Sequence, residues 1–153
     1  MNKKNIVTMK RAERLRNTPM STSTSTKNAV EFDHWTVLVR DLPESSEFYA
    51  KVFALERISE PFNDGRHVWF RVGANEQLHV VGGAKEAVQQ GIDVHVAFRV
   101  ASLGNFMNHL DEIGVKYRNF KDDGKVTVRS DGVRQIYLQD PDGYWIEVND
   151  DKF

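Results

Sequence analysis

Hydrophobic and polar residues alternate in several short stretches of the chain, which predicts β-strands with one buried face. The last of them, residues 135–149, contains Asp-Pro-Asp-Gly at 140–143, which favours a tight turn between two strands. One face of this hairpin is apolar: Ile136, Leu138, Tyr144, Ile146 and Val148. The other face carries Gln135, Tyr137, Trp145, Glu147 and Asn149. The hairpin therefore presents Glu147 among polar and aromatic neighbours.

The pattern predicts further strands earlier in the chain, at residues 32–39, 55–59, 66–72, 77–81, 93–100 and 115–120. One helix is predicted at residues 45–54, following Asp41 as its cap. A second helix is predicted from Ser102, its cap, to Ile113, before Gly114. Helices and strands mixed in this way indicate an α+β fold.

The order strand, helix, strand, strand, strand occurs twice, which indicates an internal duplication. An offset of 61 residues aligns His34 with His95, near the start of each half. An offset of 68 residues aligns His79 with Glu147, in the last strand of each half. Residues with metal-binding side chains therefore occupy matching places in the two halves.

The chain divides by composition into a tail and one ordered domain. Residues 1–30 are basic and rich in Ser and Thr, so a disordered or loosely ordered tail is expected there. Residues 31–150 form the domain, with module one at about 31–82, a linker at 83–92 and module two at about 93–150. No stretch has the length and hydrophobicity of a signal peptide or a membrane span, so a cytoplasmic location is expected.

Charge and composition exclude several classes of function. The 153 residues carry a formal net charge of −1, which gives no electrostatic basis for binding nucleic acid or an anionic membrane. The absence of cysteine excludes disulfides, thiolate metal sites and cysteine nucleophiles. Any metal ligands must therefore come from histidine, carboxylate or amide side chains.

The duplication points to a metal site. The candidate ligands are His34, His79, His95 and Glu147. Their neighbours along each strand are mostly apolar and are expected to pack beneath the helices, so the four side chains face the opposite way. Such a set is expected to bind one divalent metal ion, and its imidazole-rich character suits Zn, Fe, Ni, Co or Mn.

Substrate contacts are expected from other residues on the same face: Trp69, Arg71, Arg99 and Tyr137. Arg71 or Arg99 can hold an anionic substrate through a bidentate contact. Tyr137 can serve as a hydrogen-bond donor behind the metal ligands or as an acid. The alternatives are that the arginines are ordinary surface residues and that the aromatic side chains form the cleft wall.

Taken in order, the motifs resemble those of the vicinal oxygen chelate superfamily, which contains glyoxalase I, fosfomycin and bleomycin resistance proteins and extradiol dioxygenases. They are Asp33-His34, Asp41-Leu42, Phe48-Tyr49, Gln77-Leu78-His79, His95-Val96-Ala97-Phe98, and Asp140-Pro141-Asp142-Gly143 running to Ile146-Glu147. The resemblance covers about residues 31–150. It implies a single glyoxalase-like domain of two tandem βαβββ modules, whose curved mixed sheets enclose a metal-binding cleft.

The resemblance also implies a ligand set. Members usually place one ligand on the first and last strand of each module, which here are the positions of His34, His79, His95 and Glu147. Gln77, two residues before His79 on the same face, is the alternative for that position. Homodimers are expected by the same resemblance, with the cleft formed within one chain or between two chains.

The implied function is that of a divalent-metal-dependent, glyoxalase-like lyase or isomerase. Its small substrate would chelate the metal through vicinal oxygens, and Glu147 could also act as the base. One alternative is an iron enzyme of the extradiol dioxygenase type, for which His34, His95 and Glu147 suffice. Another is a non-catalytic protein that binds or sequesters a small molecule.

Overall fold

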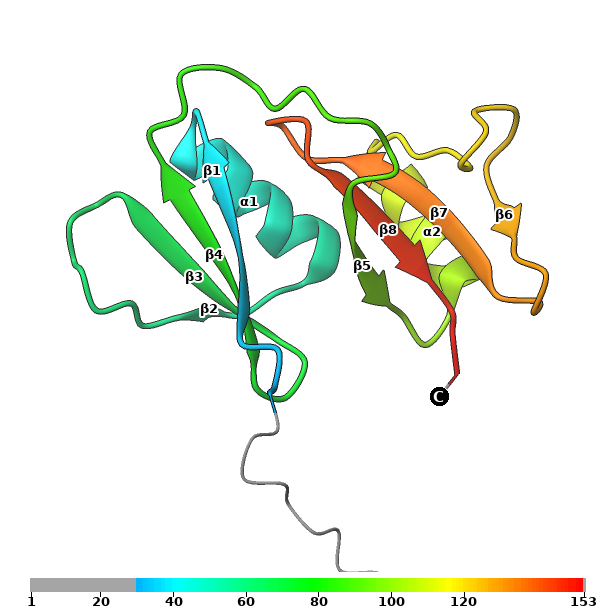
Figure 1. Cartoon of the computed structure of the whole chain (residues 1–153), viewed down its shortest axis with the longest axis horizontal. Helices are drawn as coiled ribbons and strands as arrows, with labels where there is room; N and C mark the ends of the chain where they lie inside the picture. Colours follow the sequence, from blue (N-terminus) through cyan, green and yellow to red (C-terminus); the bar gives the residue numbers. More distant parts are fainter. Residues whose placement is uncertain (1–29, 153) are drawn as a thin grey trace, which may run out of the picture. The chain divides into compact units, whose positions relative to one another are not determined.

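The computed structural model describes residues 30–152, whose elements follow the predicted order twice (Figure 1). The first module contains β1 (His34–Val39), α1 (Leu42–Phe53), β2 (Arg57–Ile58), β3 (His67–Val72) and β4 (Glu76–Gly82). The second contains β5 (His95–Arg99), α2 (Leu103–Glu112), β6 (Thr127–Val128), β7 (Arg134–Gln139) and β8 (Trp145–Asn149). The α+β fold of two βαβββ modules is therefore confirmed.

Each module forms its own four-stranded mixed sheet. The strand orders are β1-β4-β3-β2 and β5-β8-β7-β6, and in each sheet the first strand pairs in parallel with the last strand. The strand register reproduces the duplication, because Trp69 lies opposite His79 just as Tyr137 lies opposite Glu147. The offsets inferred from the sequence thus correspond to equivalent places in the two sheets.

Both helices begin at the predicted caps. The Asp41 side chain accepts a hydrogen bond from the Glu44 amide at 2.9 Å, and the Ser102 side chain accepts one from the Asn105 amide at 3.3 Å. These bonds satisfy amides that have no partner within the helix. The first helix ends at Ala54, which has a left-handed φ of 52°.

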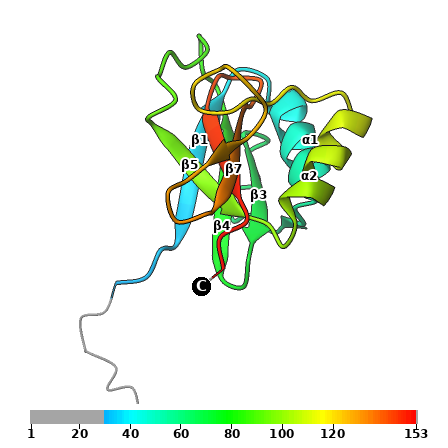
Figure 2. The same ribbon diagram turned by 90° about the vertical axis from the view of Figure 1, so that its right-hand side faces the viewer.

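The helices lie on the same side of the two sheets (Figure 2). They contact each other through Phe53 and Phe106, whose ring centroids are 5.7 Å apart. Apolar strand residues are fully buried in the core: Val37, Val39, Leu78, Val80, Ile146 and Val148. Because side chains alternate along a strand, the candidate ligands lie on the face away from the helices.

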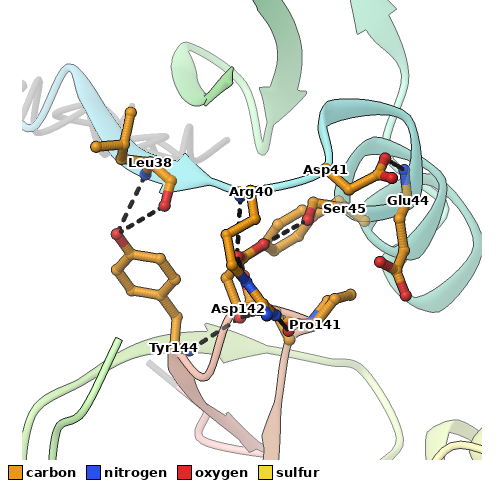
Figure 3. A network of polar contacts seen from close by, with 10 residues as sticks. Leu38, Arg40, Asp41, Glu44, Ser45, Pro141, Asp142 and Tyr144 are labelled. Carbon is orange, nitrogen blue, oxygen red and sulfur yellow. Dashed lines mark hydrogen bonds and ion pairs between the residues drawn. The ribbon is translucent and has the colours of Figure 1, made fainter. Parts of the chain in front are cut away.

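The turn at residues 140–143 joins the second module to the first (Figure 3). The Asp142 carboxylate accepts hydrogen bonds from the Arg40 amide at 2.9 Å, the Arg40 Nε at 2.8 Å and the Ser45 hydroxyl at 2.8 Å. The Tyr49 hydroxyl donates to Asp140 at 2.8 Å, and the Leu38 amide donates to the Tyr144 hydroxyl at 3.1 Å. These contacts fix the turn against β1 and α1.

Two structural expectations were wrong. The sheets are separate and do not close around a common cleft. Residues 115–120 form no strand, and only Arg118 bridges to Tyr137. The chain turns after that bridge because the Asn119 side chain bonds both the amide and the carboxylate of Asp123. Asn and Asp commonly stabilise turns through such local bonds.

The predicted tail lies almost wholly outside the described residues. In the part of the chain that the structure does describe, no helix has the length and hydrophobicity needed to cross a membrane.

Candidate metal centre

His95 and Glu147 form one pair of candidate ligands, on the neighbouring strands β5 and β8. The His95 Nε2 lies 3.4 Å from the Glu147 Oε2, a separation that two ligands of one metal ion can have. The Nδ1–H of His95 donates to the Ile92 carbonyl at 2.6 Å. This bond selects the tautomer and leaves the Nε2 lone pair facing Glu147, as in metal-binding histidines generally.

Both oxygens of Glu147 are held by neighbouring side chains. The Tyr137 hydroxyl donates to Oε2 at 2.7 Å, and the Asn149 amide donates to Oε1 at 2.8 Å. Burial and the hydrogen bond to Glu147 raise the pKa of Tyr137 well above its ordinary value. The hydroxyl therefore keeps its proton at neutral pH, which makes Tyr137 a donor to the carboxylate.

His34 and His79 form the second pair, within a stack of aromatic rings. The His79 ring lies between His34, at a centroid distance of 4.2 Å, and Trp69, at 3.9 Å. Burial, followed by repulsion from His34, lowers the pKa of His79. A neutral imidazole is the form that binds metal.

The two histidines of this pair differ in which nitrogen is engaged. The Nδ1–H of His34 donates to Asp33 at 2.5 Å, which leaves the Nε2 of His34 outside that bond. The Nε2–H of His79 donates to the Gln77 side-chain oxygen at 2.9 Å. His34 is thus oriented by its partner in the way His95 is, whereas His79 must release Gln77 before it can use Nε2.

The two pairs do not come together in one chain. Within residues 30–152, no three His, Asp or Glu side chains are grouped closely enough to hold a metal ion. The donor chemistry still suits a divalent ion, with two imidazoles in the first module and an imidazole and a carboxylate in the second. Each pair therefore fits half of a metal site, and the two halves remain apart in the described arrangement.

The expected substrate-binding residues divide between these half-sites. Trp69 packs on His79, and its Nε1 has no hydrogen-bond partner among the described residues. Arg99 lines a groove of about 600 Å³ together with Glu147. Arg71 is about half exposed, and its Nε lies 3.6 Å from a carboxylate oxygen of Glu56. These positions leave Arg99 as the arginine nearer a candidate ligand.

Three residues near the second half-site were not singled out from the sequence. Asn149 and Gln135 are more than nine-tenths buried beside Glu147 and Tyr137. Their position on the polar face of the hairpin is the signal that identifies them. Arg118, which lies 4.7 Å from the Trp145 ring centroid, comes from the mispredicted strand and had no such signal.

Comparison with known proteins agrees with this arrangement. Residues 31–148 match the model of the Glyoxalase/Bleomycin resistance protein/Dioxygenase superfamily. The chain belongs to this superfamily. A superfamily relative, Glyoxylase I 4 of Arabidopsis thaliana, is 28% identical over 123 residues, covering 76% of this chain and 68% of the relative.

Solved structures of the superfamily share the fold. Lactoylglutathione lyase from Agrobacterium tumefaciens superposes with a TM-score of 0.62 at 20% identity, over 81% of this chain and 96% of that chain. The fosfomycin resistance protein FosX from Listeria monocytogenes, in complex with Mn(II) and 1S,2S-dihydroxypropylphosphonic acid, gives 0.65 at 21% identity, over 82% and 93%. Both likenesses concern the fold.

Proposed function

We propose that this chain is a divalent-metal-dependent, glyoxalase-like lyase or isomerase that acts on a small substrate through two neighbouring oxygens. Its metal site is assembled from two copies of the chain, with His34 and His79 from one and His95 and Glu147 from the other. The observation that carries the proposal is the presence of two ligand pairs at equivalent places in the duplicated sheets.

The placement of the helices favours assembly from two chains. Since α1 and α2 cover the same side of both sheets, both ligand pairs lie on the opposite side (Figure 2). A second copy related by a two-fold axis can set each pair against the complementary pair, which gives two sites per dimer. The expectation of a homodimer becomes part of the proposal in this form.

The chemistry of the half-sites supports proton transfer at a substrate. A bound divalent ion would supply Lewis acidity that stabilises negative charge on the substrate oxygens. Glu147 is the group placed to accept a proton, since its carboxylate lines the groove. Tyr137 holds that carboxylate through its hydroxyl, and Arg99 in the same groove can bind an anionic group of the substrate.

The relatives support a metal-dependent reaction. The Arabidopsis thaliana relative carries the name of a glyoxylase, and the structure of FosX contains Mn(II) with a dihydroxypropylphosphonic acid. The latter ligand carries two neighbouring hydroxyl groups. These likenesses agree with a substrate that presents vicinal oxygens.

A second candidate is an iron enzyme of the dioxygenase type. Its observation is the geometry of His79, whose Nε2–H is engaged by Gln77 while its ring is stacked between Trp69 and His34. Without His79, the remaining set is His34, His95 and Glu147. Two histidines with one carboxylate are the usual ligands of non-haem Fe(II) oxygenases.

Elemental analysis of the purified protein tests the metal. We expect about one metal per chain in the wild type and none in Glu147→Ala or His95→Ala. His109→Ala, which removes an exposed histidine bonded to the Lys51 carbonyl, is the matched control and should keep the metal. A wild type that contains no metal and takes up none on titration would contradict the enzyme and leave a ligand-binding protein.

Two measurements separate the alternatives. Fe(II) in the wild type that persists in His79→Ala would favour the dioxygenase type. Mixing unfolded His34→Ala and Glu147→Ala chains and refolding them tests assembly, because only mixed dimers contain one intact site. We expect about one metal per four chains after mixing and none before it. No recovery on mixing would show that each site is formed within one chain.

A further inference from the structure

The Glu147 carboxylate lies at the centre of a buried chain of hydrogen bonds on the face of the sheet away from the helices. Tyr137 donates to its Oε2 at 2.7 Å, and Asn149 donates to its Oε1 at 2.8 Å. The Gln135 amide in turn donates to the Tyr137 hydroxyl. All four residues are less than a tenth exposed. Such a connected network restricts the orientation of the carboxylate.

We propose that Tyr137 and Asn149 are positioning residues that hold Glu147 ready to bind a metal ion beside His95, and that Gln135 sets the direction of the Tyr137 hydroxyl. The inference rests on the proposed function, because it assigns a role toward the metal of that site. None of the three residues need touch the metal or the substrate.

The directions of the bonds support this assignment. A tyrosine hydroxyl has one proton, so the bond accepted from Gln135 leaves that proton for Glu147. Each carboxylate oxygen has two acceptor positions, and one donor on each oxygen leaves acceptor capacity for an ion. The Oε2 that Tyr137 holds is the oxygen that lies 3.4 Å from the His95 Nε2.

The side-chain oxygen of Gln135 provides an independent observation. This atom is buried and has no hydrogen-bond partner among the described residues. A buried acceptor without a partner is unfavourable for stability, so the orientation of this amide is explained by its bond to Tyr137. The network therefore satisfies Glu147 at the expense of Gln135.

The duplication shows that the network is specific to the second module. In the first module, Trp69 occupies the place of Tyr137, opposite His79 instead of Glu147. Applying the same offset, Val81 replaces Asn149 and His67 replaces Gln135. The fold itself thus requires none of the three polar residues, and they occur where the ligand is a carboxylate.

Titration of the metal-free protein with Co²⁺, followed by visible absorption, tests the inference. Tyr137→Phe and Asn149→Ala should each weaken Co²⁺ binding roughly 10- to 100-fold and alter the absorption bands, as loss of a bond to a metal ligand does. Tyr117→Phe is the matched control, since it removes a hydroxyl that donates to the exposed Asp111 at 3.2 Å. That variant should bind as the wild type does.

Gln135→Leu separates positioning from a merely structural role. It removes the unpaired buried oxygen, so the metal-free variant should unfold at the same or a higher temperature than the wild type, while its Co²⁺ affinity falls several-fold. All titrations are performed below the unfolding transition of each variant. If wild type binds Co²⁺ and all three variants bind equally well, the positioning role is refuted and the proposed function stands. If wild type binds none, both fail.

Discussion

Replacing Asp142 by alanine tests how strongly the 140–143 turn stabilises the domain. The carboxylate is 2% exposed and accepts three hydrogen bonds, two from Arg40 and one from Ser45 (Figure 3). Alanine would leave the Arg40 amide and the fully buried Ser45 hydroxyl without this acceptor. The change also separates β1 and α1 of the first module from the turn of the second.

The expected loss follows from burial and charge. Removing one partner of a buried ion pair costs about 3–5 kcal/mol. The Arg40 side chain is 46% exposed and regains water when its partner is lost, so the lower part of that range applies, about 3–4 kcal/mol. For a domain of this size, that corresponds to a fall in Tm of roughly 10–15 °C.

Urea and thermal unfolding, followed by circular dichroism, measure the effect. The matched control is Asp150→Ala, because Asp150 also accepts bonds from an arginine amide and guanidinium, those of Arg134. That aspartate is 15% exposed and lies in the same module as its partner, so its loss should cost about 1 kcal/mol. If Asp142→Ala lowers Tm no more than Asp150→Ala does, the reasoning from burial is refuted.

Three further outcomes are expected. Gly143→Ala should cost about 2–4 kcal/mol in unfolding experiments, since φ is +90° and the new Cβ would lie 2.7 Å from the Val88 carbonyl oxygen; Gly132→Ala, with φ +89° and no atom within 4 Å, should cost only about 1 kcal/mol, and equal losses would exclude the steric effect. Burial raises the pKa of Asp142, but bonds from Arg40 and Ser45 outweigh it and hold the pKa below its usual value of 3.8. Because the folded state favours the carboxylate, this stabilisation is complete above the unfolded pKa and is lost as pH falls through the lower folded pKa; acid titration of stability should show that loss in wild type and not in Asp142→Asn. Co²⁺ at about 100 times its Kd should stabilise wild type by about 2.7 kcal/mol, and the same rise in Tm in Glu147→Ala would contradict its role as a ligand.

The strands and helices were largely predictable because their signals are local. Alternation along β7 and β8 separates Ile146 from Glu147 whatever lies around them, and Asp41 and Ser102 cap helices through bonds to residues three positions away. The failure at residues 115–120 has a local cause as well. The bonds between Asn119 and Asp123 compete with strand pairing, which apolar alternation does not reveal.

The sequence by itself determined the duplicated modules and the identity of the four candidate ligands, because equivalent positions in a repeat can be counted along the chain. It also placed Tyr137 opposite Glu147, through the hairpin register. It did not reveal the network that Asn149 and Gln135 complete around that carboxylate, since hydrogen-bond partners depend on side-chain rotamers and burial.

Only the tertiary structure decided that the ligand pairs stay apart in one chain. The position of one module against the other depends on contacts between residues about a hundred positions apart, such as Arg40 with Asp142 and Leu38 with Tyr144. Alternation and capping describe each module separately and contain no information about that placement. The physical reason is that the faces of a sheet are set by its own pleat, whereas the packing of two sheets is set by side chains at their junction.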